Sequence, residues 1–304
     1  MTTDIYCSVN SAQLGEPLYG TAVHVGVWFL LEYRAPWAAK ATNDNNLPPA
    51  VQAWLNEQVA TVPNGRLQFI KQDKKATGLT FFIAVMTGEE PIVYRFSLSS
   101  YEDLLSIDMS AIVNGDERYV ANRHADPLYF VCTHGKRDIC CAKFGLTFYN
   151  QLAAKVGKQA WQASHLGGHR FAVTLLTLPN GVNYGRLQPA DIPVLIAAQA
   201  DDGILLDRLR GQTRYSPMVQ TADYFLRQQI GVVENGRLTF QEAAQTDENR
   251  WLVRFRSREG ATYQVNLAQN EQPLQFLASC GKPKMKTVYP YQLAGIENGR
   301  GPLK

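Results

Sequence analysis

Two stretches of the sequence repeat the same succession of strand and helix patterns, and this repetition constrains the fold more than any other feature. Each stretch holds four runs rich in aromatic and β-branched residues, which is the composition of strands. The predicted strands are 24–33, 66–72, 79–86 and 92–98 in the first stretch, then 127–132, 159–164, 171–178 and 182–187 in the second. The predicted helices are one starting near Pro48 and Pro49, a short one at 100–107, and two over 139–156 and 189–202. Both stretches therefore show the order β, α, β, β, β, α of a thioredoxin-like unit, which predicts an internal duplication.

The sequence from about residue 212 onward has a different pattern. It predicts a helix over 221–231 and three antiparallel strands at 237–240, 250–256 and 262–268, with a turn at 234–236. From Cys280 onward no regular period is visible. We therefore predict an α/β (α+β) chain of three parts. These are a thioredoxin-like domain without ligands (1–120), a thioredoxin-like ferredoxin domain (121–210) and a small α+β region (211–304).

Composition narrows the functional classes. Of the 304 residues, 19% are charged and the formal net charge is +3, so neither nucleic acid nor a membrane surface is predicted as a partner. No apolar run reaches the length of a membrane span and the first residues lack a signal-peptide pattern, which predicts a cytoplasmic protein. Five cysteines, an odd number with two of them adjacent, do not resemble a disulfide framework. In a reducing compartment, clustered cysteine and histidine instead indicate metal chemistry.

Two segments concentrate the side chains that bind metals, VCTHGKRDICCAKFG at 131–145 and SHLGGHRFA at 164–172. Thiolate and imidazole are ligands of zinc and of iron-sulfur clusters. Cys132 ends a predicted strand, and Cys140 and Cys141 begin a predicted helix whose free N–H groups stabilise negative charge. His165 and His169 flank Leu-Gly-Gly, where Gly167 and Gly168 permit a tight turn.

The type of metal centre is less constrained by the residues themselves. Eight residues separate Cys132 from Cys141, whereas two to four separate the cysteines of a zinc finger. Cys132-Thr133-His134 matches half of a Rieske signature but has no second half, so we interpret His134 as a donor or structural residue near the centre. A structural zinc module stays open as an alternative. A thiol redox enzyme that uses Cys140 and Cys141 is a second alternative, although the chain has no Cys-x-x-Cys motif.

These two segments, together with GTAVHVGVWFLLEYRAPW near the start, resemble the sucrase/ferredoxin-like family over roughly residues 5–205. The resemblance implies a thioredoxin-like ferredoxin with a 2Fe-2S cluster that has two Cys and two His ligands. Carried over, these ligands are Cys132, His165, His169 and a second cysteine. Cys141 keeps the spacing of the family's Arg-Asp-x-x-Cys motif, which begins here at Arg137, so Cys140 is its neighbour. The sequence shows no carboxylate pair that would support a sucrase.

The function predicted from this site is one-electron transfer. We expect an electron carrier rather than a stand-alone enzyme. No Gly-x-Gly-x-x-Gly fingerprint is present, so any flavin or nicotinamide is expected on a redox partner protein, either a reductase or an acceptor. Arg170 and Arg186 are expected near the centre, where they either dock an acidic partner or are solvated charges. Cys7 is interpreted as a packed thiol and Cys280 as part of the tail or core.

Overall fold

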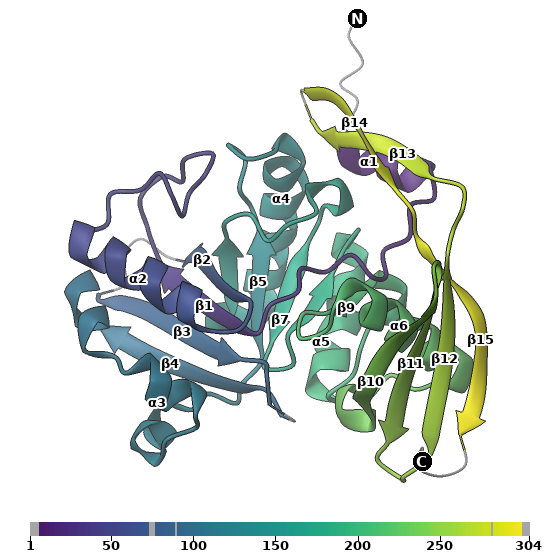
Figure 1. Ribbon diagram of the computed structural model, residues 1–304. Helices are drawn as coiled ribbons and strands as arrows, with labels where there is room; N and C mark the ends of the chain where they lie inside the picture. Colours follow the sequence, from purple (N-terminus) through teal and green to yellow (C-terminus); the bar gives the residue numbers. More distant parts are fainter. Residues whose placement is uncertain (1–5, 73–76, 89, 281, 300–304) are drawn as a thin grey trace, which may run out of the picture.

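A single nine-stranded sheet forms the centre of the computed structural model, which describes residues 6–299 except 73–76, 89 and 281 (Figure 1). The strands lie in the order β4-β3-β1-β2-β6-β5-β7-β8-β9. Their bounds are β1 Val27–Glu32, β2 Gly65–Lys71, β3 Leu79–Val85, β4 Ile92–Leu98, β5 Leu128–Cys132, β6 Ala160–Ala163, β7 Leu175–Leu178, β8 Val182–Tyr184 and β9 Leu209–Gln212.

The two halves of this sheet repeat one topology. In the first half β1 is parallel to β2 and antiparallel to β3, and β3 is antiparallel to β4. In the second half β5, β6, β7 and β8 pair in the same way. Strands β2 and β6 join the halves as an antiparallel pair, with Ile70 opposite Ala163. The repeated order seen in the sequence is therefore a repeated strand topology, and the two predicted domains share one continuous sheet.

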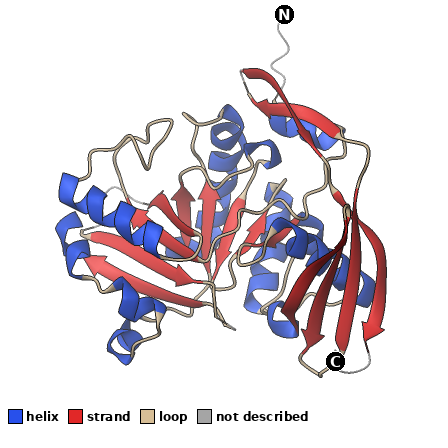
Figure 2. Ribbon diagram, viewed as in Figure 1, coloured by secondary structure: helices blue, strands red, loops and turns tan. Residues whose placement is uncertain are grey.

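The strands of this sheet are apolar on both faces, and helices cover one of these faces. All six residues of β1 are buried, with Phe29 and Leu31 facing one core and Trp28 and Leu30 facing another. The helices are α1 Cys7–Gln13, α2 Pro49–Thr61, α3 Met109–Val113, α4 Ile139–Val156, α5 Ile192–Ala200 and α6 Pro217–Ile230. Helix α2 packs on the first half of the sheet, while α4 and α5 pack on the second half (Figure 2). No helix among the described residues is both long and apolar enough to cross a bilayer.

The two halves also share a core on one face of the curled sheet. Phe82 of the first half contacts Phe130 and Trp161 of the second half edge to face, with ring centroids 5.9 and 5.5 Å apart. Cys132 and Cys141 belong to this same buried cluster. The thiols predicted to bind a metal therefore lie where the two halves pack together.

The C-terminal region forms a separate antiparallel sheet in the order β10-β11-β12-β15, and α6 packs against it. The strands are β10 Leu238–Asp247, β11 Arg250–Ser257, β12 Thr262–Gln269 and β15 Tyr291–Gly299. Two further strands, β13 Leu274–Ser279 and β14 Lys282–Val288, form a hairpin that lies beside α1 (Figure 1). The sequence predicted neither α1 nor regular structure beyond Cys280. These segments have no clear hydrophobic period of their own, and they fold by packing against remote parts of the chain.

Candidate metal centre

Strand pairing brings the first cysteine and the first histidine together. Cys132 is the last residue of β5, and the parallel strand β6 places Ala163 opposite it. The backbone N–H of Thr133 continues the ladder by donating to the carbonyl of Ala163 at 3.1 Å. His165 follows two residues later at the same edge of the sheet, because parallel strands end together. The Sγ atoms of Cys132 and Cys141 and a ring nitrogen of His165 all lie within 4.8 Å of one another.

Helix α4 supplies Cys141 from its first turn. Asp138 is the N-cap and accepts a hydrogen bond from the N–H of Cys140 at 2.9 Å. The helix approaches β5 so closely that a Cβ on Gly145 would lie 2.1 Å from the carbonyl oxygen of Cys132. A glycine at this position thus allows the start of α4 to sit against the end of β5.

The second histidine comes from a turn that the two glycines make possible. Gly167 and Gly168 have φ angles of +95° and +73°, and His169 begins a short 3-10 helix, His169–Phe171. The rings of His165 and His169 lie with their centroids 5.2 Å apart. His169 is not among the three residues whose donor atoms lie within 4.8 Å, but its ring is next to that of His165.

One ring nitrogen of each histidine, Nδ1, is buried and has no hydrogen-bond partner among the described residues. Nε2 of His169 lies 2.6 Å from the carbonyl oxygen of Ala278. A carbonyl can only accept, so Nε2 carries the proton and Nδ1 carries a free lone pair. Nδ1 of His169 and Nδ1 of His165 are both buried without a hydrogen-bond partner in the described part of the chain. Nδ1 of His134 and Nε2 of His124 are buried without a partner as well, so the position of His165 and His169 beside the two thiols is what makes them candidate ligands.

The pKa values of Cys132 and Cys141 are shifted in opposite directions. The Cys141 thiol donates a hydrogen bond to Cys132, which holds the pKa of Cys132 well below its usual value against the opposing effect of burial. The His165 side chain and the backbone N–H of His134 lower the pKa of Cys132 further. The same hydrogen bond, with burial, raises the pKa of Cys141. Of the two thiols, Cys132 therefore loses its proton more readily, and the deprotonated form is the one that binds metals.

Two arginines, the buried Arg210 and the partly buried Arg66, add positive charge near Cys132. Arg210 is 1% exposed and donates to the carbonyl of Gly167 at 3.0 Å and to Oδ1 of Asn183 at 2.6 Å. Burial lowers the pKa of Arg210 to about 9, and the charge of Cys132 acts in the opposite direction. Arg66 donates to the carbonyl of His165 at 3.1 Å. These two arginines fix the loop that carries the histidines, and sequence reasoning did not identify either of them.

The other residues singled out in the sequence have distinct positions. His134 binds the carbonyl of Ala38 through Nε2 at 2.8 Å and offers its backbone N–H to Cys132, so it acts as a donor beside the centre. Arg137 is exposed and lines a cleft of about 470 Å³ together with Lys40, Arg66, His134 and His165. His165 is partly exposed in this cleft.

Arg170 and Arg186 both bind the segment around α1. Arg170 forms an ion pair with Glu16 at 2.8 Å. Arg186 donates to the carbonyls of Ser11 and Glu16 at 3.1 and 2.8 Å. Both arginines therefore attach the segment that contains and follows α1 to the main sheet. Their charges are used inside the protein rather than being offered to solvent.

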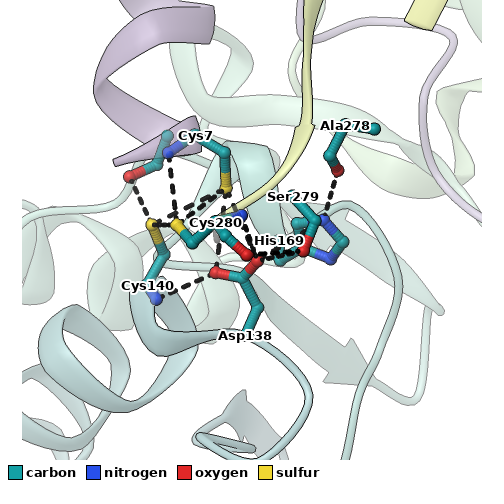
Figure 3. A network of polar contacts seen from close by, with 8 residues as sticks. Cys7, Asp138, Cys140, His169, Ala278, Ser279 and Cys280 are labelled. Atoms are coloured by element: carbon teal, nitrogen blue, oxygen red, sulfur yellow. Dashed lines mark hydrogen bonds and ion pairs between the residues drawn. The ribbon is translucent and has the colours of Figure 1, made fainter. Parts of the chain in front are cut away.

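Cys140 lies in a second group of side chains, with Cys7, Cys280 and Asp138 (Figure 3). Cys7 is buried and Cys280 is partly exposed, and both lie next to Cys140, within the approach to the candidate centre that the sequence left open for them. The sequence did contain one signal for this second group. Adjacent residues of an α-helix point about 100° apart, so the neighbours Cys140 and Cys141 cannot serve the same small site equally.

Comparison with known proteins assigns the chain to a family whose model covers the four candidate ligands. The model of the sucrase/ferredoxin-like family matches residues 18–211, a range that contains Cys132, Cys141, His165 and His169. The chain belongs to the sucrase/ferredoxin-like family. Membership covers the whole nine-stranded sheet up to β9, and the resemblance seen in the sequence is confirmed.

A curated relative of this sucrase/ferredoxin-like protein is Altered inheritance of mitochondria protein 32 from Meyerozyma guilliermondii. It is 25% identical over 167 residues, which cover 49% of this chain and 57% of the relative. The match thus spans little more than half of that relative's length. The comparison with solved structures found no match. The α1 helix and the C-terminal region lie outside the range of the family model.

Proposed function

We propose that this protein is a one-electron carrier that holds a 2Fe-2S cluster on Cys132, Cys141, His165 and His169. The observation that carries the proposal is the grouping of the Cys132 and Cys141 sulfur atoms with a ring nitrogen of His165 within 4.8 Å of one another, next to the ring of His169. Two cysteines and two histidines are a known ligand set for such a cluster. The donor set of this chain fits the group, and the sucrase/ferredoxin-like membership supports it.

The chain's own residues would set the redox behaviour of the site. When bound, the cluster supplies a centre that accepts and returns one electron. Neutral imidazoles in place of two thiolates lower the negative charge of the site, which raises its potential above that of an all-cysteine ferredoxin. Arg210 and Arg66 add positive charge nearby, and the backbone N–H of His134 donates to the sulfur of Cys132. Each of these contacts favours the reduced state.

The cleft beside His165 is the proposed docking place for a redox partner. Exposed Lys40 and Arg137 and partly buried Arg66 give its wall a positive charge. An acidic protein surface would be attracted there, and His165 lies at the shortest approach to the centre. We further propose that each half of the main sheet is a thioredoxin-like unit, with the first half acting as a scaffold.

Anaerobic purification tests the cluster directly. We expect a red-brown protein with two iron and two sulfide ions per chain, and a reduced form whose electron paramagnetic resonance spectrum has a low average g value. A colourless protein that contains zinc alone at these residues would refute the electron-transfer proposal. A full cluster that persists after Cys132→Ala would instead refute the ligand set.

Replacing His165 or His169 by Cys should lower the reduction potential and flatten its dependence on pH. The added thiolate charge disfavours the reduced state, and a ligated imidazole is lost as a group that releases a proton. Protein-film voltammetry between about pH 6 and 9 measures both effects. His24→Cys, at an exposed position, is the matched control and should leave the potential and its slope unchanged. An unaltered slope in the His165 and His169 variants would contradict proton coupling.

A further inference from the structure

Three cysteines that the proposed cluster does not use meet at one point of the fold, together with one carboxylate (Figure 3). The Sγ atoms lie 3.7 Å apart for Cys7 and Cys140, 3.2 Å for Cys140 and Cys280, and 3.5 Å for Cys280 and Cys7. The carboxylate oxygens of Asp138 lie 3.7 and 3.8 Å from Sγ of Cys7. Cys7, Cys140 and Asp138 are buried, and Cys280 is partly exposed.

These residues come from three segments that are remote in the sequence. Helix α1 supplies Cys7, the N-terminus of α4 supplies Asp138 and Cys140, and the turn of the β13–β14 hairpin supplies Cys280. Arg170 and Arg186 hold the α1 segment against the main sheet, and the guanidinium of Arg170 also lies 4.4 Å from the ring of Phe276 in β13. The arrangement is thus built by contacts around the cluster and not by the cysteines alone.

We propose that Cys7, Cys140, Cys280 and Asp138 form a second metal site that binds one zinc ion. A tetrahedral zinc ion with Zn–S bonds of about 2.3 Å holds its sulfur ligands roughly 3.8 Å apart, and a sulfur and an oxygen ligand about 3.5 Å apart. The two sulfur pairs of Cys7, at 3.7 and 3.5 Å, and the 3.7 Å between Cys7 and Asp138 are close to those values, while the Cys140–Cys280 pair is shorter, at 3.2 Å. Four protein ligands close the coordination shell, which is the pattern of a structural site.

The carboxylate of Asp138 is oriented for this role. Its Oδ1 accepts from the N–H of Cys140, and its Oδ2 accepts from the N–H of Cys280 and the hydroxyl of Ser279, each at 2.9 Å. These donors fix the carboxylate and offset part of its charge. Two of the sulfur atoms also accept hydrogen bonds. Ser8 Oγ donates to Sγ of Cys140 at 3.3 Å, and the backbone N–H of Cys7 donates to Sγ of Cys280 at 3.3 Å.

A larger cluster or a disulfide fits these contacts less well. Ligands on different irons of a cluster are separated by the width of the cluster, whereas all three sulfur atoms here are mutually in contact. A disulfide between Cys140 and Cys280 would need a bond of about 2.05 Å and would leave Cys7 and the oriented carboxylate without a role. A single zinc ion, in contrast, would be bound by all four side chains.

Zinc at this position would fasten α1 and the hairpin onto the segment that carries the proposed cluster ligands. Cys140 is adjacent to Cys141, and Ala278 beside the hairpin turn accepts the hydrogen bond from Nε2 of His169. The zinc site is thus a structural support for the cluster loop. The two sites share no ligand, although Nε2 of His169 lies 3.7 Å from Oδ2 of Asp138 (Figure 3).

The test compares metal content in the full chain and in two matched serine variants. Cys280→Ser removes a partly exposed ligand of the zinc site, and Cys132→Ser removes a ligand of the proposed cluster. By elemental analysis, Cys280→Ser should lose one equivalent of zinc and keep its iron and sulfide. Cys132→Ser should lose iron and sulfide and keep the zinc. Zinc that remains in Cys280→Ser, or that disappears in Cys132→Ser instead, would overturn the proposal.

Cobalt(II) gives a second readout that does not rely on metal retained during purification. After zinc removal, wild-type protein titrated with cobalt should develop intense thiolate-to-cobalt absorption and tetrahedral visible bands at one equivalent. Asp138→Asn, which preserves the shape of the side chain, should weaken cobalt binding about 10- to 100-fold. A spectrum that is the same in Cys7→Ser as in wild type would exclude this site. A mass lower by two hydrogens in the purified protein, with no zinc, would show a disulfide there and exclude it as well.

Discussion

At the scale of single residues, the candidate metal centre is defined by the ring nitrogens of His165 and His169 and by the thiol of Cys132. Nδ1 of His165 and Nδ1 of His169 are buried without a hydrogen-bond partner among the described residues, and a ring nitrogen of His165 lies within 4.8 Å of the Cys132 sulfur. Arg210, almost fully buried, donates to the carbonyl of Gly167 in the turn between the two histidines. Because Nδ1 of His134 and Nε2 of His124 are also buried without a partner, it is the nearness of His165 to the two thiols, and of His169 to His165, that marks them as candidate ligands.

A histidine outside the site gives a prediction for stability against pH. Burial lowers the pKa of His124 below its ordinary value of 6.5, with Arg95 acting in the same direction and Asp126 opposing it. The unfolded chain therefore binds a proton more readily at this residue than the folded chain does. Stability from neutral His124 is complete above about pH 6.5 and is lost as the pH falls below it. His124→Gln should reduce this loss in urea titrations from pH 7.5 to 5.5; an identical pH profile would contradict the assignment.

At the scale of elements, the N-terminus of α4 organises both groups of ligands. The helix presents Cys141 to the shared core of the two sheet halves and Cys140 to α1 and the hairpin. Asp138 caps the helix and also belongs to the second group. One turn of helix therefore fixes the distance between two proposed metal sites, and any displacement of α4 would affect both.

Gly145 is the position at which such a displacement can be produced. In Gly145→Ala the new Cβ would lie 2.1 Å from the carbonyl oxygen of Cys132, so the helix must move away from β5. We expect a loss of about 1–3 kcal/mol in unfolding free energy, although alanine favours helices, together with a lower iron content. Gly295→Ala is the matched control, because no heavy atom lies within 4 Å of its added Cβ. Urea denaturation measures both, and equal stability of the two variants would argue against the close contact.

At the scale of the whole molecule, a buried charge pair within α6 supports the residues that connect the C-terminal region to the rest of the chain. Arg227 and Asp223 of α6 are 0% and 1% exposed and pair at 2.9 Å. Arg227 also donates to the carbonyls of Glu234 and Asn235, and the side chain of Asn235 donates to the carbonyl of Asp202 at the end of α5. This connection links the small sheet with the nine-stranded one.

Arg227→Met should cost about 3–5 kcal/mol of unfolding free energy, because it leaves the Asp223 carboxylate buried without its partner. Replacing both residues, as Arg227→Met with Asp223→Leu, should recover much of that loss, since no unpaired charge remains. Chemical denaturation monitored by circular dichroism checks both variants. A single variant as stable as the double one would mean that the pair is not desolvated in the folded protein.

The sequence by itself determined the elements with strong periods and the main ligand segments. The repeated order of strands and helices, the helix that begins after Asp138 and the Gly167-Gly168 turn all follow from local patterns of burial and backbone freedom. It also indicated the sucrase/ferredoxin-like family, because the motifs around Cys132 and His165 are long and contiguous.

Only the tertiary structure decided how remote segments combine. The pairing of β2 with β6 joins two halves into one sheet, and no local pattern specifies which edges of two sheets will meet. Cys7 and Cys280, which are 273 residues apart, meet Cys140 through packing of α1 and a hairpin whose sequence has no strong period. Arg66 and Arg210 were missed because a buried arginine and an exposed one look alike in a sequence. What separates them is desolvation, which is a property of the surroundings and not of the residue.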